Sequence, residues 1–163
     1  MATEQELRDA LKGAIHLRAR MYYHIFRALR DELGEEKATQ LMKMAIRKGG
    51  EDVGPRFAPH APDDLAGLKE SFINWVPDKA SMFEPEVVCC NHADGLKIHF
   101  HACPLKEAYQ EMGLSDQEME KILAIAAAID GGIFETAGFE FVSETWKPGE
   151  SGCCRLTIKP GKK

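Results

Sequence analysis

Two histidines and a cysteine recur at every second position in one stretch of the sequence, at His99, His101 and Cys103. Between residues 96 and 103 apolar and polar side chains alternate, which is the period of an extended strand. On a strand these three side chains share one face, with successive members about 6.5–7 Å apart. We therefore predict a strand that ends at Pro104, with an apolar face in the core and a face of titratable groups.

Imidazole and thiol groups on one face have three interpretations, and the sequence leaves all three open. A cysteine beside an imidazole is a candidate nucleophile, because the thiolate is the reactive form and a neighbouring base favours it. The same groups are ligands of zinc or another borderline metal, although the paired spacing of a zinc finger is absent. In the third interpretation the face is only the solvated side of an antiparallel sheet.

A carboxylate and two pairs of cysteines add further candidates. Asp130 follows a long apolar helical pattern and precedes two glycines, so it either caps a turn or orients a histidine or a water molecule. Four of the five cysteines form the adjacent pairs Cys89-Cys90 and Cys153-Cys154, and one member of each pair could share the face of Cys103. Buried strand thiols and a thiol redox sensor are the alternative interpretations of these pairs.

The first half of the chain has helical periodicity. Thr3 and Glu6 have the spacing of a capping box, and apolar residues recur at helical spacing from residue 7 to residue 33. A second helical pattern covers residues 38–46, and we expect it to end at Gly49-Gly50. The short connection between the two patterns predicts an antiparallel helical hairpin.

The pattern changes to strands in the second half. A segment rich in Pro and Gly, residues 51–62, predicts a loop long enough to lie over a pocket, and a third helix follows. The expected strands cover residues 86–92, 96–103, 139–145 and 153–158, and the helices between them cover residues 104–112 and 115–129. Two hairpins with helices before and between them indicate an α+β fold, in which helices pack on an antiparallel sheet of about four strands.

Length and composition indicate one ordinary globular domain over residues 1–163, mainly helical in 1–80 and hairpin-helix-hairpin in 81–160. The formal net charge is −5 and no basic stripe is present, which argues against nucleic-acid binding. No run of about 18–20 apolar residues indicates a membrane span, and no signal peptide is recognisable. We therefore expect a cytoplasmic protein; homo-oligomerisation stays open.

The layout of the chain resembles that of the L-2-amino-thiazoline-4-carboxylic acid hydrolase-like family, from about residue 15 to residue 158. The residues that carry the resemblance are Arg20, Tyr23, Leu29, Gly34, Ala38, Leu41, Gly49-Gly50, Cys103-Pro104, Tyr109, Gly113, Asp130, Phe139 and Gly152 to Leu156. The resemblance implies hydrolytic opening of a small heterocycle at a carbon–nitrogen bond. Ala126 and Ala127 stand where several members carry a further cysteine.

Together, the shared strand face and the resemblance predict a small hydrolase that acts on a non-peptide, cyclic C–N bond. Cys103 is the expected nucleophile or a substrate-binding group. His101, or else His99, is the expected general base and later acid. Asp130 is expected to orient a base or water.

The resemblance also implies substrate-binding residues, namely Cys154, Arg20 and Tyr23. The expected partner is a small-molecule substrate, and no cofactor is expected, although a metal at His99, His101 and Cys103 stays open. The alternative function is a non-catalytic, sensor-like domain that binds a small molecule or a metal.

Overall fold

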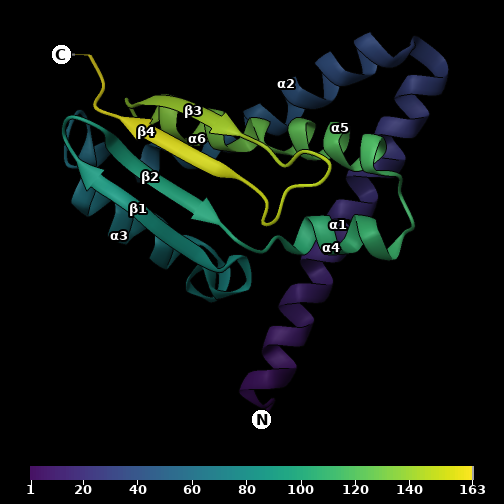
Figure 1. Cartoon of the computed structure of the whole chain (residues 1–163), viewed down its shortest axis with the longest axis horizontal. Helices are drawn as coiled ribbons and strands as arrows, with labels where there is room; N and C mark the ends of the chain where they lie inside the picture. Colours follow the sequence, from purple (N-terminus) through teal and green to yellow (C-terminus); the bar gives the residue numbers. More distant parts are fainter. Residues whose placement is uncertain (163) are drawn as a thin grey trace.

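The helical hairpin at the N-terminus forms as the sequence predicts. In the computed structural model, which describes residues 1–162, α1 (Glu4–Leu33) begins at a capping box in which the Thr3 and Glu6 side chains bond each other's backbone N–H. Gly34 then reverses the chain with a φ of +81°, a conformation that favours glycine. α2 (Glu35–Val53) turns back at an angle to α1 and packs against both α1 and α6 (Ala128–Thr136) (Figure 1).

Two glycine positions that the sequence suggested as helix ends lie inside helices instead. Gly50 is in α2, and Gly132 is in α6. At the crossing of these helices, a Cβ on Gly50 would overlap the carbonyl of Ile129, and a Cβ on Gly132 would overlap the carbonyl of Arg47. Glycine is therefore needed for close helix packing, which outweighs its cost of about 1 kcal/mol in a helix interior.

Shorter elements complete the helical part. They are the helices α3 (Leu65–Trp75), α4 (Pro104–Glu111) and α5 (Asp116–Ala126), and the 3₁₀ turns η1 (Gly54–Arg56), η2 (Ala58–His60) and η3 (Pro77–Phe83). A second capping box, between Ser115 and Glu118, starts α5. The predicted loop over residues 51–62 is thus largely the end of α2 and two 3₁₀ turns. Within residues 1–162, no helix is long and apolar enough to cross a membrane.

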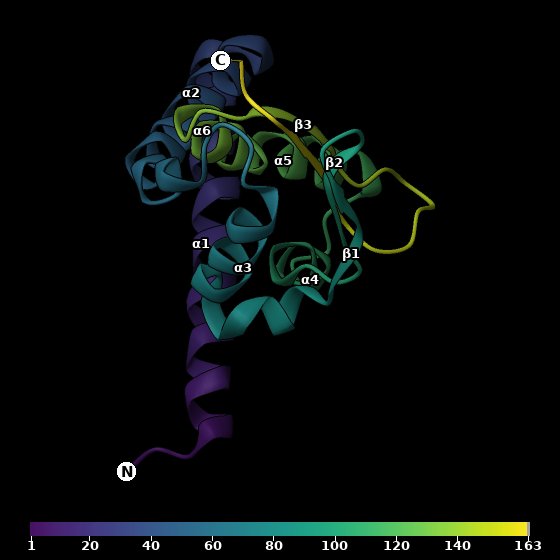
Figure 2. The same ribbon diagram turned by 90° about the vertical axis from the view of Figure 1, so that its left-hand side faces the viewer.

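The four strands form two hairpins, as predicted. They are β1 (Pro85–Asn91), β2 (Gly95–Phe100), β3 (Glu140–Glu144) and β4 (Arg155–Lys159). The sheet order is β1-β2-β4-β3, and all neighbours are antiparallel. Helices cover one face of the sheet, and its other face is open (Figures 1 and 2). In β2 the apolar side chains Leu96, Ile98 and Phe100 are buried, which confirms the predicted core face.

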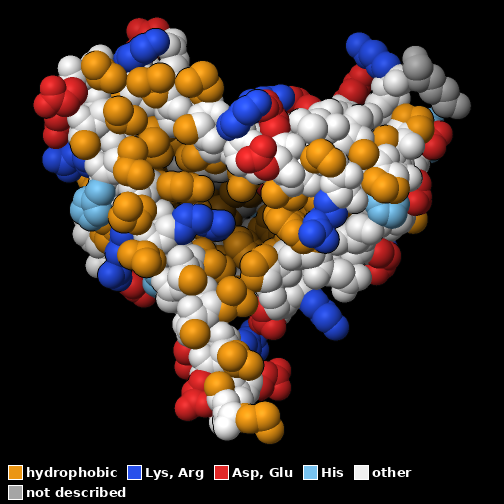
Figure 3. Space-filling model, turned by 180° about the vertical axis from the view of Figure 1, so that it is seen from behind, with side chains coloured by type: hydrophobic (Ala, Val, Ile, Leu, Met, Phe, Trp, Pro, Cys, Tyr) orange, Lys and Arg blue, Asp and Glu red, His pale blue; other side chains and the backbone are white. Residues whose placement is uncertain are grey.

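The buried side chains form two adjoining clusters. One lies among α1, α2, α4 and α5, and the other lies between the sheet and the helices α3 and α6. Seen from behind, the surface is hollowed at its centre, and hydrophobic side chains gather around the hollow (Figure 3). The candidate site lies where the two clusters meet.

Candidate functional site

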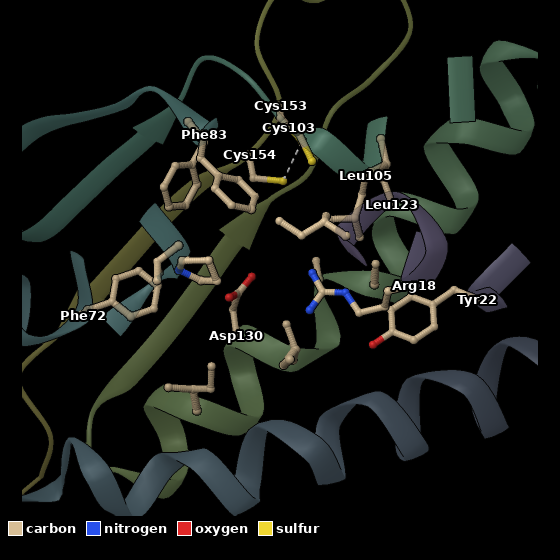
Figure 4. Close-up of a pocket in the computed structure, with 18 of the residues that line it drawn as sticks. Arg18, Tyr22, Phe72, Phe83, Cys103, Leu105, Leu123, Asp130, Cys153 and Cys154 are labelled. Atoms are coloured by element: carbon tan, nitrogen blue, oxygen red, sulfur yellow. Dashed lines mark hydrogen bonds between the residues drawn. The ribbon is translucent and has the colours of Figure 1, made fainter. Parts of the chain in front are cut away.

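A cavity of about 180 Å³ lies between the two core clusters. Its wall is mostly apolar and comes from α1, α3, η3, α4, α5 and α6 together with the end of β2. The exceptions are a few side chains with polar or reactive groups, namely Arg18, Tyr22, Asp130, Cys103, Cys153 and Cys154. Figure 4 shows these groups directed toward a common centre from different elements. A mostly apolar pocket with few polar groups is the usual form of a small-molecule site.

The end of β2 places Cys103 in this cavity. β2 stops at Phe100, whose N–H and carbonyl are bonded to Cys154 and Cys153 at 2.9 Å each. The chain then turns inward, so Cys103 is the N-cap residue of α4, and Pro104 is the first helical residue. The predicted strand was therefore three residues too long, and Cys103 is buried rather than on the open face.

The surroundings of Cys103 favour its thiolate. The Cys153 thiol, as hydrogen-bond donor, is the largest cause that lowers the pKa of Cys103 below its ordinary value. The backbone N–H groups of Lys106 and Leu105 at the start of α4, and the charge of Lys106, act in the same direction, while burial opposes them. A helix N-terminus and a nearby cation are typical of reactive cysteines. Cys103 therefore has the properties of a nucleophile.

Cys153 and Cys154 lie just before β4 rather than within it, which corrects the predicted strand start. Their sulfur atoms are 3.2 Å apart, and both residues line the cavity with Cys103. The hydrogen bond with Cys103 is the main cause that raises the pKa of Cys153, so this thiol stays protonated and acts as a donor. Cys154, predicted as a substrate-binding residue, thus lies in the cavity wall.

Asp130 also faces the cavity, from the first turn of α6. Burial and the charge of Arg18 act on the pKa of its carboxyl group, and no hydrogen bond contributes. Burial raises the pKa of Asp130 to about 7, and the charge of Arg18 only partly opposes this shift. A carboxyl group with a pKa near neutrality can both donate and accept a proton, which is the property of a general acid–base catalyst.

On α1 the cavity is lined by Arg18 and Tyr22, not by the expected Arg20 and Tyr23. Arg20 is exposed and pairs with Glu111 at 3.6 Å. Tyr23 is buried in the helical core, where its hydroxyl donates a hydrogen bond of 2.8 Å to Glu118. Arg20 and Tyr23 therefore do not line this cavity. Ile15, Arg18 and Tyr22 have the three- and four-residue spacing of one helix face, a signal that could have identified them.

Aromatic and apolar side chains that the sequence suggested only as core residues form another wall of the cavity. Phe72 and Trp75 come from α3, and Phe83 comes from the end of η3. Phe83 packs on Phe100 with ring centroids 5.6 Å apart. Pro77 and Phe83 of η3 thus line the cavity, whereas none of residues 51–62, predicted to lie over a pocket, lines it.

The two histidines do not join Cys103. His99 lies on the open face of β2, and His101 follows the strand with an exposed side chain that contacts Glu86 at 2.7 Å. Neither histidine lines the cavity. The prediction that His99, His101 and Cys103 share one strand face is wrong, because the strand ends before Cys103.

Comparison with known proteins gives one family. The family model described as L-2-amino-thiazoline-4-carboxylic acid hydrolase matches residues 14–156, which include the cavity-lining residues from Ile15 to Cys154. No curated protein and no solved structure matches the chain.

Proposed function

The chain belongs to the L-2-amino-thiazoline-4-carboxylic acid hydrolase family, and on this premise we propose that it hydrolyses a C–N bond in a small cyclic amide, amidine or thiazoline. The family name suggests a hydrolase. The observation that carries the finer proposal is the pairing of two groups in one cavity, the Cys103 thiol with a lowered pKa and the Asp130 carboxyl with a pKa of about 7. A nucleophile and an acid–base group are the two requirements for opening such a ring.

In the first step the Cys103 thiolate attacks the ring carbon that is bonded to nitrogen. A carbon–sulfur bond forms and gives a tetrahedral adduct. The ring C–N bond then breaks, and the leaving nitrogen takes the proton of Asp130. The ring-opened substrate remains attached to Cys103 as a thioester, or as a thioimidate if the substrate is an amidine.

In the second step the Asp130 carboxylate accepts a proton from water as the water oxygen attacks the same carbon. The carbon–sulfur bond breaks, and Cys103 leaves as the thiolate that the Cys153 thiol and the start of α4 favour. The product has gained one molecule of water, and both protein groups return to their starting protonation states. Asp130 thereby takes the acid–base role that the sequence suggested for a histidine.

The size and charge of the cavity limit the substrate. A volume of about 180 Å³ is below the roughly 300–1,000 Å³ typical of drug-sized ligands, so it fits a single small ring with few substituents. Arg18 directs its guanidinium group into the cavity opposite Asp130 (Figure 4). A guanidinium group binds carboxylates through paired hydrogen bonds. We infer that the substrate carries a carboxylate that binds to Arg18.

We expect the Arg18→Gln variant to raise KM for a carboxylate-bearing substrate by about 10- to 150-fold, with a smaller effect on kcat. The reason is the loss of a hydrogen-bonded charge pair, which contributes about 1.5–3 kcal/mol. Steady-state kinetics measure this change. Arg20→Gln is the matched control, because Arg20 does not line the cavity, and it should leave KM unchanged. Equal effects of the two variants would contradict the assignment.

Trapping of the covalent intermediate tests the proposed function directly. The full chain is mixed with 2-aminothiazoline-4-carboxylate and related cyclic amides, quenched in acid, and digested for mass spectrometry. We expect ring-opened product together with an adduct on the peptide that contains Cys103. Product formation without any adduct, unchanged in Cys103→Ser, would overturn the covalent mechanism.

The mostly apolar wall of the cavity favours a second candidate, a non-catalytic domain that binds a small molecule. Binding of these compounds without turnover, seen by calorimetry, would support this candidate over the hydrolase.

All five cysteines are free thiols, which supports a reducing, cytoplasmic compartment.

A further inference from the structure

Three potential metal ligands gather on the open face of the sheet, away from the cavity. They are Glu86, His99 and His101, and the ligand atoms that they offer all lie within 4.8 Å of one another. The imidazole rings of His99 and His101 have centroids 4.1 Å apart. The proposed hydrolase uses none of these side chains.

The sheet register explains why these side chains meet. Glu86 of β1 is the direct partner of His99 of β2, so their side chains lie on the same face. His101 is two residues further along the chain, and its backbone N–H is bonded to the Glu84 carbonyl at 3.2 Å. This bond extends the pairing of the two chain segments beyond β2, so the backbone itself holds the cluster together.

His99 contributes a second, independent observation. Its Nε2 atom is buried and has no hydrogen-bond partner within residues 1–162. The chain near Gly152 covers this atom, because a Cβ on Gly152 would come within 3.0 Å of it. A buried polar atom without a partner is rare in folded proteins and needs an explanation.

We propose that Glu86, His99 and His101 bind a first-row divalent metal ion, for which Zn²⁺ is well suited. Two imidazoles and one carboxylate are a common ligand set for zinc, and they leave a fourth position for water. With bonds of about 2.0–2.1 Å, two ligands of a tetrahedral zinc lie about 3.3 Å apart. The present distance between His101 Nε2 and Glu86 Oε2 is 2.7 Å, and both side chains are exposed and can rotate to open this distance.

The charges around the cluster are mixed. Arg155 of β4 is the register partner of His99 on its other side, and its positive charge opposes a cation. Glu150 pairs with this guanidinium group at 3.7 Å and reduces its effect. Glu86 supplies a negative charge within the ligand set itself. This balance favours a moderately tight site whose affinity falls when Glu86 loses its charge.

Zinc titration of the chelator-treated full chain tests the proposal, with calorimetry for stoichiometry and with Co²⁺ absorption as a report on ligand type. We expect one metal per chain. His101→Ala should weaken binding by at least about 100-fold, since losing even an outer-shell partner costs 10- to 100-fold. Glu86→Gln should weaken it by about tenfold or more. The His101 and Glu86 side chains are 44% and 57% exposed, so both variants should fold.

Two controls separate this site from other histidines and from the cavity thiols. His92→Ala removes an exposed histidine from the same hairpin and should not change zinc affinity. Cys103→Ser should also retain binding, and the cobalt complex should lack the charge-transfer band of a cobalt–thiolate bond. Substoichiometric binding, or zinc binding that survives His101→Ala and is lost in Cys103→Ser, would overturn the proposal. These outcomes are independent of hydrolase activity.

Discussion

Replacement of Cys103 by serine is expected to lower kcat for ring opening by at least about 10³-fold, because the nucleophile of a covalent mechanism cannot be replaced by other groups in the site. Serine keeps the size of the buried side chain but lacks an easily formed anion. The Cys153 thiol, the start of α4 and Lys106 lower the pKa of the Cys103 thiol. They therefore do not produce a comparable anion from the serine hydroxyl of the variant. Single-turnover kinetics of the variant measure the loss.

The control for this prediction is His101→Ala. His101 is exposed and lies outside the cavity, so its removal should leave kcat and KM within about twofold of the original values, as is usual for surface changes. Circular dichroism checks that both variants are folded. Full turnover in folded Cys103→Ser would show that Cys103 does not form the covalent intermediate. A loss in His101→Ala alone would instead move the chemistry to the open face of the sheet.

Asp130→Asn is expected to have opposite effects on activity and on stability. Asparagine has nearly the same shape but cannot transfer a proton, so kcat should fall by about 10²–10⁴-fold. In the original protein kcat/KM should decrease as the pH rises through about 7, because Asp130 must be protonated to donate to the leaving nitrogen. The pH profile of the variant should lack this limb.

The stability effect follows from the raised pKa of Asp130, which moves from 3.8 to about 7 in the folded protein. Below pH 3.8 both the folded and the unfolded states hold the proton, so the group has no effect. Between pH 3.8 and about pH 7 only the unfolded state loses the proton of Asp130. The folded state therefore becomes progressively less stable as the pH rises to about 7. At 1.36 kcal/mol per pKa unit the full destabilisation is about 4 kcal/mol.

Urea unfolding at pH 4 and at pH 8 measures this difference. Asp130→Asn should be more stable than the original protein at pH 8, by up to about 4 kcal/mol, and nearly equal to it at pH 4. Asp63→Asn is the matched control, because Asp63 is exposed and its replacement should change little at either pH. If Asp130→Asn were destabilised equally at both pH values, the carboxyl group would not have the raised pKa on which this prediction rests.

Local sequence signals were sufficient for most of the secondary structure. The capping boxes at Thr3 and Ser115 start α1 and α5 because their hydrogen bonds join residues only three positions apart. The alternation of Leu96, Ile98 and Phe100 likewise predicted the buried face of β2. The α+β class and the two hairpins followed from such short-range patterns, which depend on few long-range contacts.

The ends and crossings of these elements depended on distant residues. β2 ends at Phe100, where the chain pairs with Cys153 and Cys154, and this separates Cys103 from the two histidines. Gly132 lies inside α6, where α2 approaches so closely that no Cβ would fit. No short window of sequence contains both partners of either contact.

The sequence by itself identified Cys103, Asp130 and Cys154 as candidates. Each carries a thiol or a carboxyl group, and each lies at a position that carries the family resemblance. The tertiary structure decided that they share one cavity, and that Arg18 and Tyr22 rather than Arg20 and Tyr23 face it. Each residue along a helix rotates its side chain by about 100°. Periodicity therefore identifies the faces of α1, but only the packing of α2, α4 and α5 against it decides which face lines the site.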